Sequence, residues 1–238
     1  MQVEIDILYE SGPVLVVSKP PGLLTQAPPG IDSLEVRIKA FLKARDAKPG
    51  NVYLGVPHRL DRPASGAMVF GKHVRATRRL AEQFEARQVR KVYWACVAGE
   101  VQPEEGTWED FLCKIPGQPR AEVSRPDEPD ARRAVLHYRT QGRGPWGTWL
   151  EIELETGRTH QVRVQAASRG HPILGDAFYG STVAFGEQIE DQRLRAIALH
   201  ARSITFHHPM TGELVTVTAP VAGAWLELGL RYDRSFAK

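Results

Sequence analysis

Four strand-like segments follow one another between Gly106 and Leu154 with no helical pattern between them. They read TWEDFLC, EVSR, RRAVLHYRT and TWLEIELE, and a Gly-Pro-Trp-Gly turn joins the last two. Strands joined directly by short connections pair antiparallel, because a parallel pair needs a long crossover. This run therefore predicts an antiparallel sheet and argues against a doubly wound parallel architecture.

Further strand and helix patterns surround this run. Short strands are predicted in DILYESGPVLVVSKPPGLL (two, around a Ser-Gly-Pro turn), AMVFG, VRKVYWACVAGEV and ALHARSITFHHPMTGELVTVTAP (two, around a turn). Helices are predicted in SLEVRIKAFLKARD with Ser33 as N-cap, from about His73 to Ala86, in RTHQVRVQAASRG and in AGAWLELGLRY. Together these patterns predict an α+β fold with a mixed, largely antiparallel central sheet and flanking helices.

The composition is that of an ordinary globular chain, with 238 residues, 42% hydrophobic. No Gly/Ser-rich linker and no internal repeat interrupts it, so a single domain over residues 1–238 is expected. The first residues lack a basic n-region and no apolar run nears the length of a membrane span, so neither a secretory signal nor a membrane partner is expected. The isolated Cys96 and Cys113 favour a reduced, cytoplasmic protein without a disulfide framework or zinc site.

Positive charge is concentrated in one segment. The whole chain has a net charge of +3, whereas the stretch from Lys72 to Tyr93 holds seven cations and two acids, a net charge of +5. Such a concentration suits contact with a nucleic-acid backbone. A solvated helix face with i,i+4 ion pairs, such as Arg78 with Glu82, explains the same pattern. The charge alone leaves both interpretations open.

The stretch HRLDRPASGAMVFGK, residues 58–72, surrounds Asp61 with cationic side chains, His58 or Arg59 on one side and Arg62 on the other. Pro63, Ser65 and Gly66 then break the chain before an apolar strand. An aspartate in a loop is commonly a turn former. A rigid frame of this kind also fixes a carboxylate for chemistry.

Two other stretches carry candidate functional residues. In ETGRTHQVRVQ, more polar side chains crowd the start of a predicted helix than capping needs, although an exposed, well-capped helix would read similarly. These residues are Arg158, Thr159, His160, Gln161 and Arg163. In RKVYWACV, Tyr93 fits either a half-buried core position or a stacking face for a nucleobase.

The combination of motifs resembles the RluA-type family of RNA pseudouridine synthases. In order along the chain stand KPPGL from Lys19, HRLDRPASGAMVF from His58, KVYWA from Lys91 and TGRTHQVRV from Thr156, followed by HPILGDAFYG and the LHA and HPMTGE segments. These motifs extend from about Asp6 to Thr218. The resemblance implies the pseudouridine synthase fold with a catalytic cleft, and an isomerase that acts on ribosomal or transfer RNA without a cofactor or metal.

The resemblance also implies roles for individual residues. Asp61 would be the catalytic aspartate, Tyr93 would pack against the target uracil, and Arg158 would pair with Asp61. Arg59 corresponds to an arginine that can fill the gap left by the extruded nucleotide. The other residues expected to bind substrate are His58, Arg62, Thr159, His160, Gln161 and Arg163.

Two positions depart from the family pattern. Ala64 stands where the family usually has threonine, and Gln165 where it usually has histidine. Neither is the expected nucleophile or its partner, so activity is expected to survive while the hydrogen bonding around the loop differs. The chain is also expected to lack the small N-terminal RNA-binding domain of several relatives and to be a monomer.

The reaction breaks the N1–C1′ bond of uridine and forms a C5–C1′ bond. An ionised carboxylate can act as nucleophile or base in it, and a guanidinium favours the ionised form. Three other functions can be compared with these motifs. A non-catalytic RNA-binding or RNA-folding protein with this fold remains the alternative. A hydrolase using Asp61 with His58 or His160 finds no supporting motif, and a kinase lacks the Gly-rich loop and DFG sequence.

Overall fold

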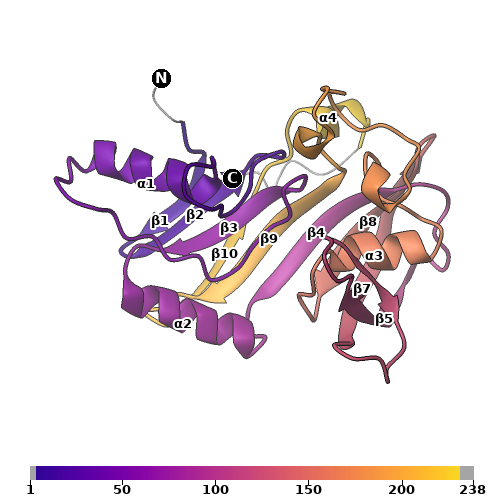
Figure 1. The fold of residues 1–238 in the computed structure, drawn as a ribbon, viewed down its shortest axis with the longest axis horizontal. Helices are drawn as coiled ribbons and strands as arrows, with labels where there is room; N and C mark the ends of the chain where they lie inside the picture. The colour runs from indigo at the N-terminus through magenta and orange to yellow at the C-terminus, as the bar shows by residue number, and fades with distance from the viewer. Residues whose placement is uncertain (1–3, 231–238) are drawn as a thin grey trace. The chain divides into compact units, whose positions relative to one another are not determined.

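The computed structural model describes residues 4–230, which form two compact units. The first unit comprises residues 4–91 and 201–221, and the second comprises residues 92–200 and 222–230. Each unit contains strands and helices, coloured by position along the chain in Figure 1. The chain therefore passes from the first unit into the second at residue 92, returns to the first at residue 201 and enters the second again at residue 222.

The first unit is built on a sheet of short strands. Its strands are β1 (Ile7–Ser11), β2 (Val14–Lys19), β3 (Ser65–Gly71), β9 (Leu199–His207) and β10 (Leu214–Thr218). β2 pairs antiparallel with both β1 and β3, β9 lies next to β3, and β10 pairs antiparallel with β9. All five were predicted from the sequence.

Two capped helices complete the first unit. Helix α1 (Leu34–Arg45) begins where the Ser33 hydroxyl accepts a hydrogen bond from Val36 N at 3.3 Å, as predicted. Helix α2 (Val74–Glu85) begins where His73 Nδ1 accepts from Ala76 N at 3.1 Å. In both cases a side chain satisfies an N–H group that has no partner within the helix.

The core of the first unit explains why β2 reads as an unbroken apolar run. Val14 and Val16 pack with Val69 of β3, Leu80 of α2 and Phe206 of β9. Leu15 and Val17, which alternate with them, are also fully buried, so both faces of β2 are covered. Because β2 is covered on both faces, its last residue, Lys19, is also buried.

The second unit contains a five-stranded antiparallel array. Its order is β4 (Arg90–Val97), β8 (Gly147–Leu154), β7 (Arg132–Gly144), β5 (Glu105–Lys114) and β6 (Ala121–Ser124). The helical segments are α3 (Gln161–Ser168), η1 (Ala177–Tyr179), η2 (Gln192–Leu194) and α4 (Ala224–Glu227). The predicted α+β class with a largely antiparallel sheet is confirmed.

Two predicted helices differ from the observed ones. Helix α3 begins at Gln161 rather than at Arg158, because His160 adopts left-handed backbone angles with φ 54°. Helix α4 has four residues and is followed by Gly229 at φ +67°; the last two residues of the predicted segment, 231 and 232, lie outside the described residues. The two 3-10 turns had no signal in the sequence. Among residues 4–230, no helix combines the length and apolarity needed to cross a bilayer.

Candidate active site

Asp61 lies in the first unit, in the loop that leads into β3. Its carbonyl oxygen accepts a hydrogen bond from Ala64 N at 3.1 Å, which closes a turn. On the preceding residue, the Thr25 hydroxyl donates to Leu60 O at 3.0 Å and accepts from Leu60 N at 3.2 Å. Leu60 and Ala64 are both buried, so the backbone on either side of Asp61 is fixed.

Lys19 is the main support of this loop. It ends β2 with its side chain fully buried, and Nζ donates to the carbonyl oxygens of Pro20 at 2.9 Å, Arg62 at 3.1 Å and Ala64 at 2.8 Å. Burial lowers the pKa of Lys19 to about 7, while the Asp61 carboxylate acts in the opposite direction. The lysine thus interacts electrostatically with Asp61, and in its ammonium form it uses all three of its donors on the backbone.

Arg62 joins the same two segments. Its Nε donates to Gly22 O at 2.9 Å, and its carbonyl oxygen accepts from Gly22 N at 2.8 Å. The KPPGL and HRLDRPASG motifs, which are about forty residues apart in sequence, therefore form one hydrogen-bonded structure around Asp61.

His58 anchors the start of the loop. Its Nε2 accepts a hydrogen bond from Val69 N at 3.1 Å, and its ring stacks on Phe84 of α2 with centroids 4.5 Å apart. Burial, together with the nearby Lys91 ammonium, lowers the pKa of His58 to about 3. His58 is therefore neutral, and Arg59 and Arg62 are the cations that flank Asp61. Contact of His58 with substrate stays a prediction.

The positions around Asp61 differ in exposure. Arg59 is exposed, and no hydrogen bond or ion pair with another described residue holds its guanidinium. Ala64, which replaces the usual threonine, is fully buried. Gly66 has φ +118°, and a Cβ there would lie 2.3 Å from Ala201 O of β9. Only glycine fits such a close approach of two backbones.

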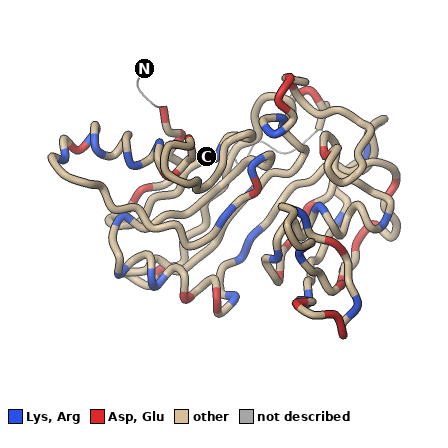
Figure 2. Tube along the Cα trace, viewed as in Figure 1, with Lys and Arg blue, Asp and Glu red and all other residues tan. Residues whose placement is uncertain are grey.

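The cations of the basic segment in the first unit have different partners; the positions of Lys and Arg along the chain are blue in Figure 2. Lys72 pairs with Glu10, and Arg79 Nη1 donates to Pro209 O at 2.6 Å. Arg78 lies 3.5 Å from Glu82, which confirms the predicted i,i+4 pair. The exposed cations of the segment are Arg75, Arg78, Arg87 and Arg90. Some cations of the segment therefore serve the fold and others face solvent, and their contact with a nucleic-acid backbone stays a prediction.

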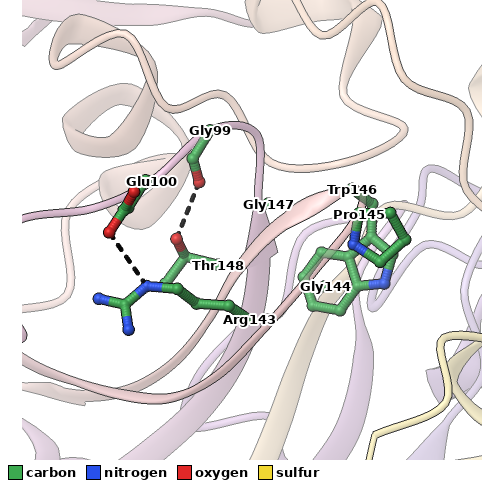
Figure 3. A pocket seen from close by; sticks show the side chains of 8 residues that line it. All are labelled: Gly99, Glu100, Arg143, Gly144, Pro145, Trp146, Gly147 and Thr148. Atoms are coloured by element: carbon green, nitrogen blue, oxygen red, sulfur yellow. Dashed lines mark hydrogen bonds and ion pairs between the residues drawn. The ribbon is translucent and has the colours of Figure 1, made fainter.

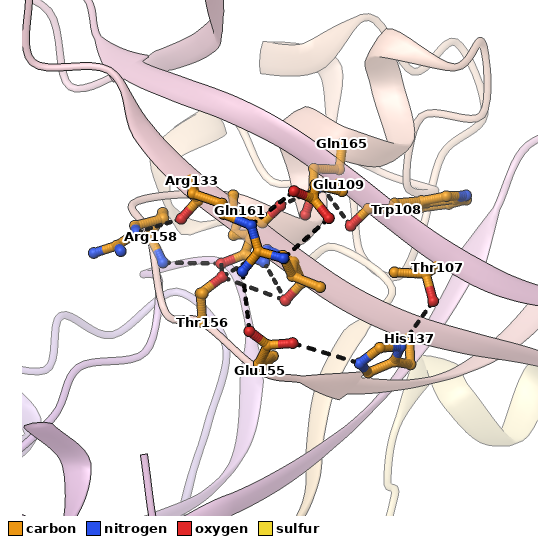
Figure 4. Close-up of polar contacts among 12 residues, drawn as sticks. Thr107, Trp108, Glu109, Arg133, His137, Glu155, Thr156, Arg158, Gln161 and Gln165 are labelled. Atoms are coloured by element: carbon orange, nitrogen blue, oxygen red, sulfur yellow. Dashed lines mark hydrogen bonds and ion pairs between the residues drawn. The ribbon is translucent and has the colours of Figure 1, made fainter. Parts of the chain in front are cut away.

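In the second unit, the turn that contains Arg158 is bound to strand β7 (Figure 4). Gln161 Oε1 accepts from the Thr156 hydroxyl at 2.7 Å and from Arg158 N at 3.0 Å, and its Nε2 donates to Val135 O at 3.0 Å. The Thr156 hydroxyl also accepts from Val135 N at 2.8 Å. Both side chains are buried, so this network fixes the backbone of the turn.

Arg158 itself lies against the edge of β7. Its Nε donates to Arg133 O at 2.9 Å, while the Arg133 guanidinium binds Glu109 and Glu155. Thr159 is partly buried between Arg158 and His160. The structure thus brings the residues of the TGRTHQ motif together in the second unit, and His58, Arg59, Asp61 and Arg62 together in the first.

Arg163 has a partner that the sequence did not reveal. Its Nε and Nη2 donate to the two carboxylate oxygens of Asp176 at 2.7 and 2.8 Å, and both side chains are buried. A buried, two-pronged pair of this kind holds α3 to the segment before η1. Contact of Arg163 with substrate stays a prediction.

Two further predicted positions lie in the interior of the second unit. Tyr93 on β4 is 9% exposed and pairs across the sheet with Ile152. Gln165, which replaces the usual histidine, is fully buried, and its Nε2 donates to Trp108 O at 3.1 Å and Asp110 Oδ2 at 2.7 Å. This departure therefore supplies an amide donor to the core of the unit.

A cavity of about 290 Å³ in the second unit has none of the predicted site residues in its lining (Figure 3). It is lined by Gly99, Glu100 and the β7–β8 turn around Trp146, with Arg143 bound to Glu100. Within residues 4–230, no group of three or more His, Cys, Asp or Glu side chains could hold a metal ion.

Lys19 and Gln161 show what the sequence alone did and did not reveal. The sequence marks Lys19 only as the first residue of the KPPGL motif. Its position just after the apolar run VLVV is nevertheless a signal that the lysine is buried. The three hydrogen bonds of Gln161 go to Thr156, Arg158 and Val135, and its contact with substrate stays a prediction. Fixed polar networks of this kind depend on segments distant in sequence, which a single motif does not display.

The arrangement of these motifs is that of a known enzyme family. The family model described as RNA pseudouridylate synthase matches residues 13–168, which include both HRLD and TGRTHQ. The chain therefore belongs to the RNA pseudouridine synthase family, and its resemblance to the RluA type is confirmed by the relatives below.

Relatives of known name cover nearly the whole chain. It is 37% identical over 226 residues to ribosomal large subunit pseudouridine synthase D of Xanthomonas campestris, covering 92% of this chain and 66% of the relative. It is 33% identical to the dual-specificity RNA pseudouridine synthase RluA of Vibrio vulnificus, covering 90% of this chain and 82% of that protein. The chain thus spans 66% of the length of several relatives and more of others.

Solved structures show the same fold. Human RNA pseudouridylate synthase domain containing 4 has a TM-score of 0.75 with 23% identity, covering 91% of this chain and 88% of the other. Human RNA pseudouridylate synthase domain containing 1 has a TM-score of 0.72 with 24% identity, covering 93% and 85%. The predicted pseudouridine synthase fold is confirmed.

Proposed function

We propose that this chain isomerises specific uridines in ribosomal or transfer RNA to pseudouridine, with Asp61 as the catalytic aspartate. The observation that carries the proposal is the support of the Asp61 loop by Lys19, which donates to the carbonyl oxygens of Arg62 and Ala64 and so holds the backbone that follows the carboxylate. A loop that only turned the chain would not need a buried ammonium to fix it. Family membership supplies the reaction.

The chemistry asks for a carboxylate held still against a nucleotide removed from its stack. Asp61 would act as nucleophile or base while the N1–C1′ bond breaks and the C5–C1′ bond forms. Extrusion of the uridine costs a few kcal/mol, which contacts to the base can offset. Tyr93 would supply an aromatic face for the uracil, and Arg59, which is exposed, would occupy the space that the uridine leaves.

The remaining assignments follow the family pattern. Arg158 would pair with Asp61 during the reaction, and His58, Arg62, Thr159, His160, Gln161 and Arg163 would contribute to substrate binding directly or through the loops they hold. The exposed arginines of the basic segment would bind phosphates that flank the uridine. We further propose that residues 1–238 act as one catalytic domain, as a monomer in the cytoplasm.

The decisive experiment compares wild-type protein with the Asp61→Asn variant. Pseudouridines in total RNA are mapped by a reagent that marks them, in cells with the gene, without it, and with the variant. We expect specific pseudouridines to disappear in both the deletion and the variant strain, while the purified variant still binds RNA. Conversion by Asp61→Asn at the wild-type rate would overturn the proposal.

A second outcome separates catalysis from binding. If the deletion removes no pseudouridine, while loss of the protein impairs RNA folding and Asp61→Asn restores it, the non-catalytic RNA-binding alternative is correct. The Asp46→Asn variant is a suitable control, because Asp46 lies on the surface at the end of α1. It is expected to leave modification unchanged.

A further inference from the structure

Phe178 is an exposed aromatic side chain on a rigid part of the second unit. It belongs to the 3-10 turn η1 and is 45% exposed, whereas its neighbour Tyr179 is 8% exposed. The exposed part of this phenyl ring makes no hydrophobic contribution to the stability of the folded chain. Single exposed apolar residues are common, so the surroundings of Phe178 decide whether it has a use.

The ring of Phe178 is held in place by its neighbours. It packs edge-on against Tyr179 with centroids 5.4 Å apart, and against His160 at 6.3 Å. The Tyr179 hydroxyl lies 2.8 Å from His160 Nδ1 and bonds to both the N–H and the carbonyl oxygen of Ala121. Phe178 is therefore an exposed ring on a fixed base, which loses little entropy when it binds a partner.

A guanidinium without a carboxylate partner lies beside this ring. The Cζ atom of Arg120 is 5.4 Å from the centroid of Phe178 and 5.1 Å from that of Tyr179. Among the described residues, no Asp or Glu forms an ion pair with Arg120. Arg163 also lies near both rings, but Asp176 neutralises it. One uncompensated positive charge therefore adjoins the exposed aromatic surface.

An exposed ring beside a free cation matches the chemistry of an unpaired nucleotide. The base can stack on the aromatic face, and the phosphate can bind the guanidinium. A protein partner would more often need a larger apolar area, and a lone ring with a cation does not supply it. His160, which contacts Phe178, belongs to the same turn as Arg158, so the surface borders residues assigned to the reaction.

We propose that Phe178 and Arg120 form a binding platform for an unpaired nucleotide of the RNA substrate, next to the target uridine. The inference rests on the proposed function, because it takes RNA as the substrate. It adds an RNA contact that lies outside the HRLD and TGRTHQ motifs. The base stacks on Phe178, and Arg120 binds the phosphate of the same or the adjacent nucleotide.

The test measures binding of a fluorescently labelled single-stranded oligouridylate to the full chain by anisotropy at several salt concentrations. Phe178→Ala is expected to weaken binding about fivefold to a hundredfold, the effect of losing one stacked base, and Phe178→Trp to retain it. Arg120→Gln is expected to weaken binding and to reduce the salt slope by about 0.7, which corresponds to one lost phosphate contact. Leu226→Ala removes an exposed apolar side chain of α4, 57% exposed against 45% for Phe178, and should change neither value.

A second measurement locates the contact. Ultraviolet cross-linking of an oligouridylate that contains 4-thiouridine, followed by mass spectrometry, should find the peptide with Phe178 in the wild type and lose it in Phe178→Ala. Unchanged affinity in Phe178→Ala and Arg120→Gln would overturn the inference, as would absence of wild-type binding. If Phe178→Ala fails to fold, the Phe178→Trp and Arg120→Gln results decide.

The two proposals fail in different ways. Asp61→Asn should bind the oligouridylate as the wild type does and form no pseudouridine. If the wild type forms pseudouridine but Phe178→Ala has normal affinity and normal KM on its RNA, only the platform is wrong. If Phe178→Ala binds weakly but deletion of the gene removes no pseudouridine, the platform stands and the reaction is wrong.

Discussion

The loop around Asp61 and the turn around Arg158 are both fixed structures, but different chemistry fixes them. The Asp61 loop rests on titratable side chains, the buried ammonium of Lys19 and the neutral imidazole of His58. The Arg158 turn rests on Thr156 and Gln161, which carry no titratable group and share acceptors. The first support is concentrated and sensitive to pH, and the second is distributed and neutral.

This difference has a physical basis. A lysine ammonium satisfies three carbonyl oxygens at once, so its loss exposes all three. In the turn, Val135 O is reached by Gln161 Nε2, by the Thr156 hydroxyl and by Thr156 N, at 3.0 to 3.3 Å. Removal of one donor there leaves others in place. The comparison therefore predicts unequal responses to substitution.

Lys19→Met should have the largest effect. It leaves the carbonyl oxygens of Pro20, Arg62 and Ala64 buried without their donor, and we expect the free energy of unfolding to fall by about 3–5 kcal/mol. Urea denaturation followed by circular dichroism measures this. Lys39→Met, at a partly exposed ion pair with Glu35, should change the value by less than about 0.5 kcal/mol. If the Lys19→Met protein were as stable as the Lys39→Met protein, the Asp61 loop would not depend on the Lys19 ammonium.

His58→Gln tests the sensitivity to pH. The folded pKa of His58 is about 3 and its ordinary value is 6.5, so between these values the unfolded chain binds more protons than the folded one. Stability from the neutral imidazole is present above pH 6.5 and is lost as the pH falls toward 3. We expect the wild type to lose up to about 1.4 kcal/mol per pH unit more than His58→Gln in this window.

The measurement is urea denaturation of both proteins at several pH values from 6.5 down to about 4. Subtraction of the two curves removes the contribution of the carboxylates that both proteins share. Gln141→Leu, at an exposed position of β7 without a titratable group, should follow the wild-type curve. Parallel curves for the wild type and His58→Gln would show that His58 is not held neutral.

Gln161→Leu should have a moderate effect. The substitution removes the acceptor of Thr156 Oγ1 and Arg158 N and one of the donors to Val135 O. Because Thr156 still binds both polar groups of Val135, we expect a loss of about 1–2 kcal/mol in the free energy of unfolding. Gln141→Leu, at an exposed position of β7, serves as the matched control. A loss as large as that of Lys19→Met would show that the turn, too, depends on a single group.

Arg78→Ala should have the smallest effect on stability. Arg78 is 72% exposed and lies 3.5 Å from Glu82, so the pair contributes about 0.3–0.5 kcal/mol. If Arg78 binds a phosphate, the Arg78→Ala substitution should lower the affinity of the protein for RNA more at low salt than at high salt. Denaturation and anisotropy on the same protein preparation separate the two roles. An equal loss of affinity at every salt concentration would contradict phosphate contact.

The sequence predicted the elements of both units more reliably than the supports of the site. Alternation and turn residues gave all ten strands, because these signals are local. The start of α3 was placed three residues too early, since the left-handed backbone at His160 depends on the turn around Gln161. Helix α4 was predicted too long, because it ends at Glu227, before Gly229 at φ +67°, although the apolar pattern continues to Leu230.

The motifs identified the family, but they did not reveal which motif residues hold the chain. Gln161 and Arg163 lie in a motif expected to contact RNA, and their observed partners are Val135 O and Asp176. The partner of Arg163 is thirteen residues away and that of Lys19 more than forty. Such pairings depend on the packing of strands, which spacing within one motif does not encode.

Gly66 limits how β3 and β9 can move against each other. A Cβ added at Gly66 would lie 2.3 Å from Ala201 O, so no residue type other than glycine could take its place. A slip of the two strands by one repeat of the pleat would bring a side chain into that contact and cost a steric clash. The start of β3, three residues after Arg62, therefore cannot shift along the strand direction, and random mutation at the Gly66 codon should be among the least tolerated in the gene.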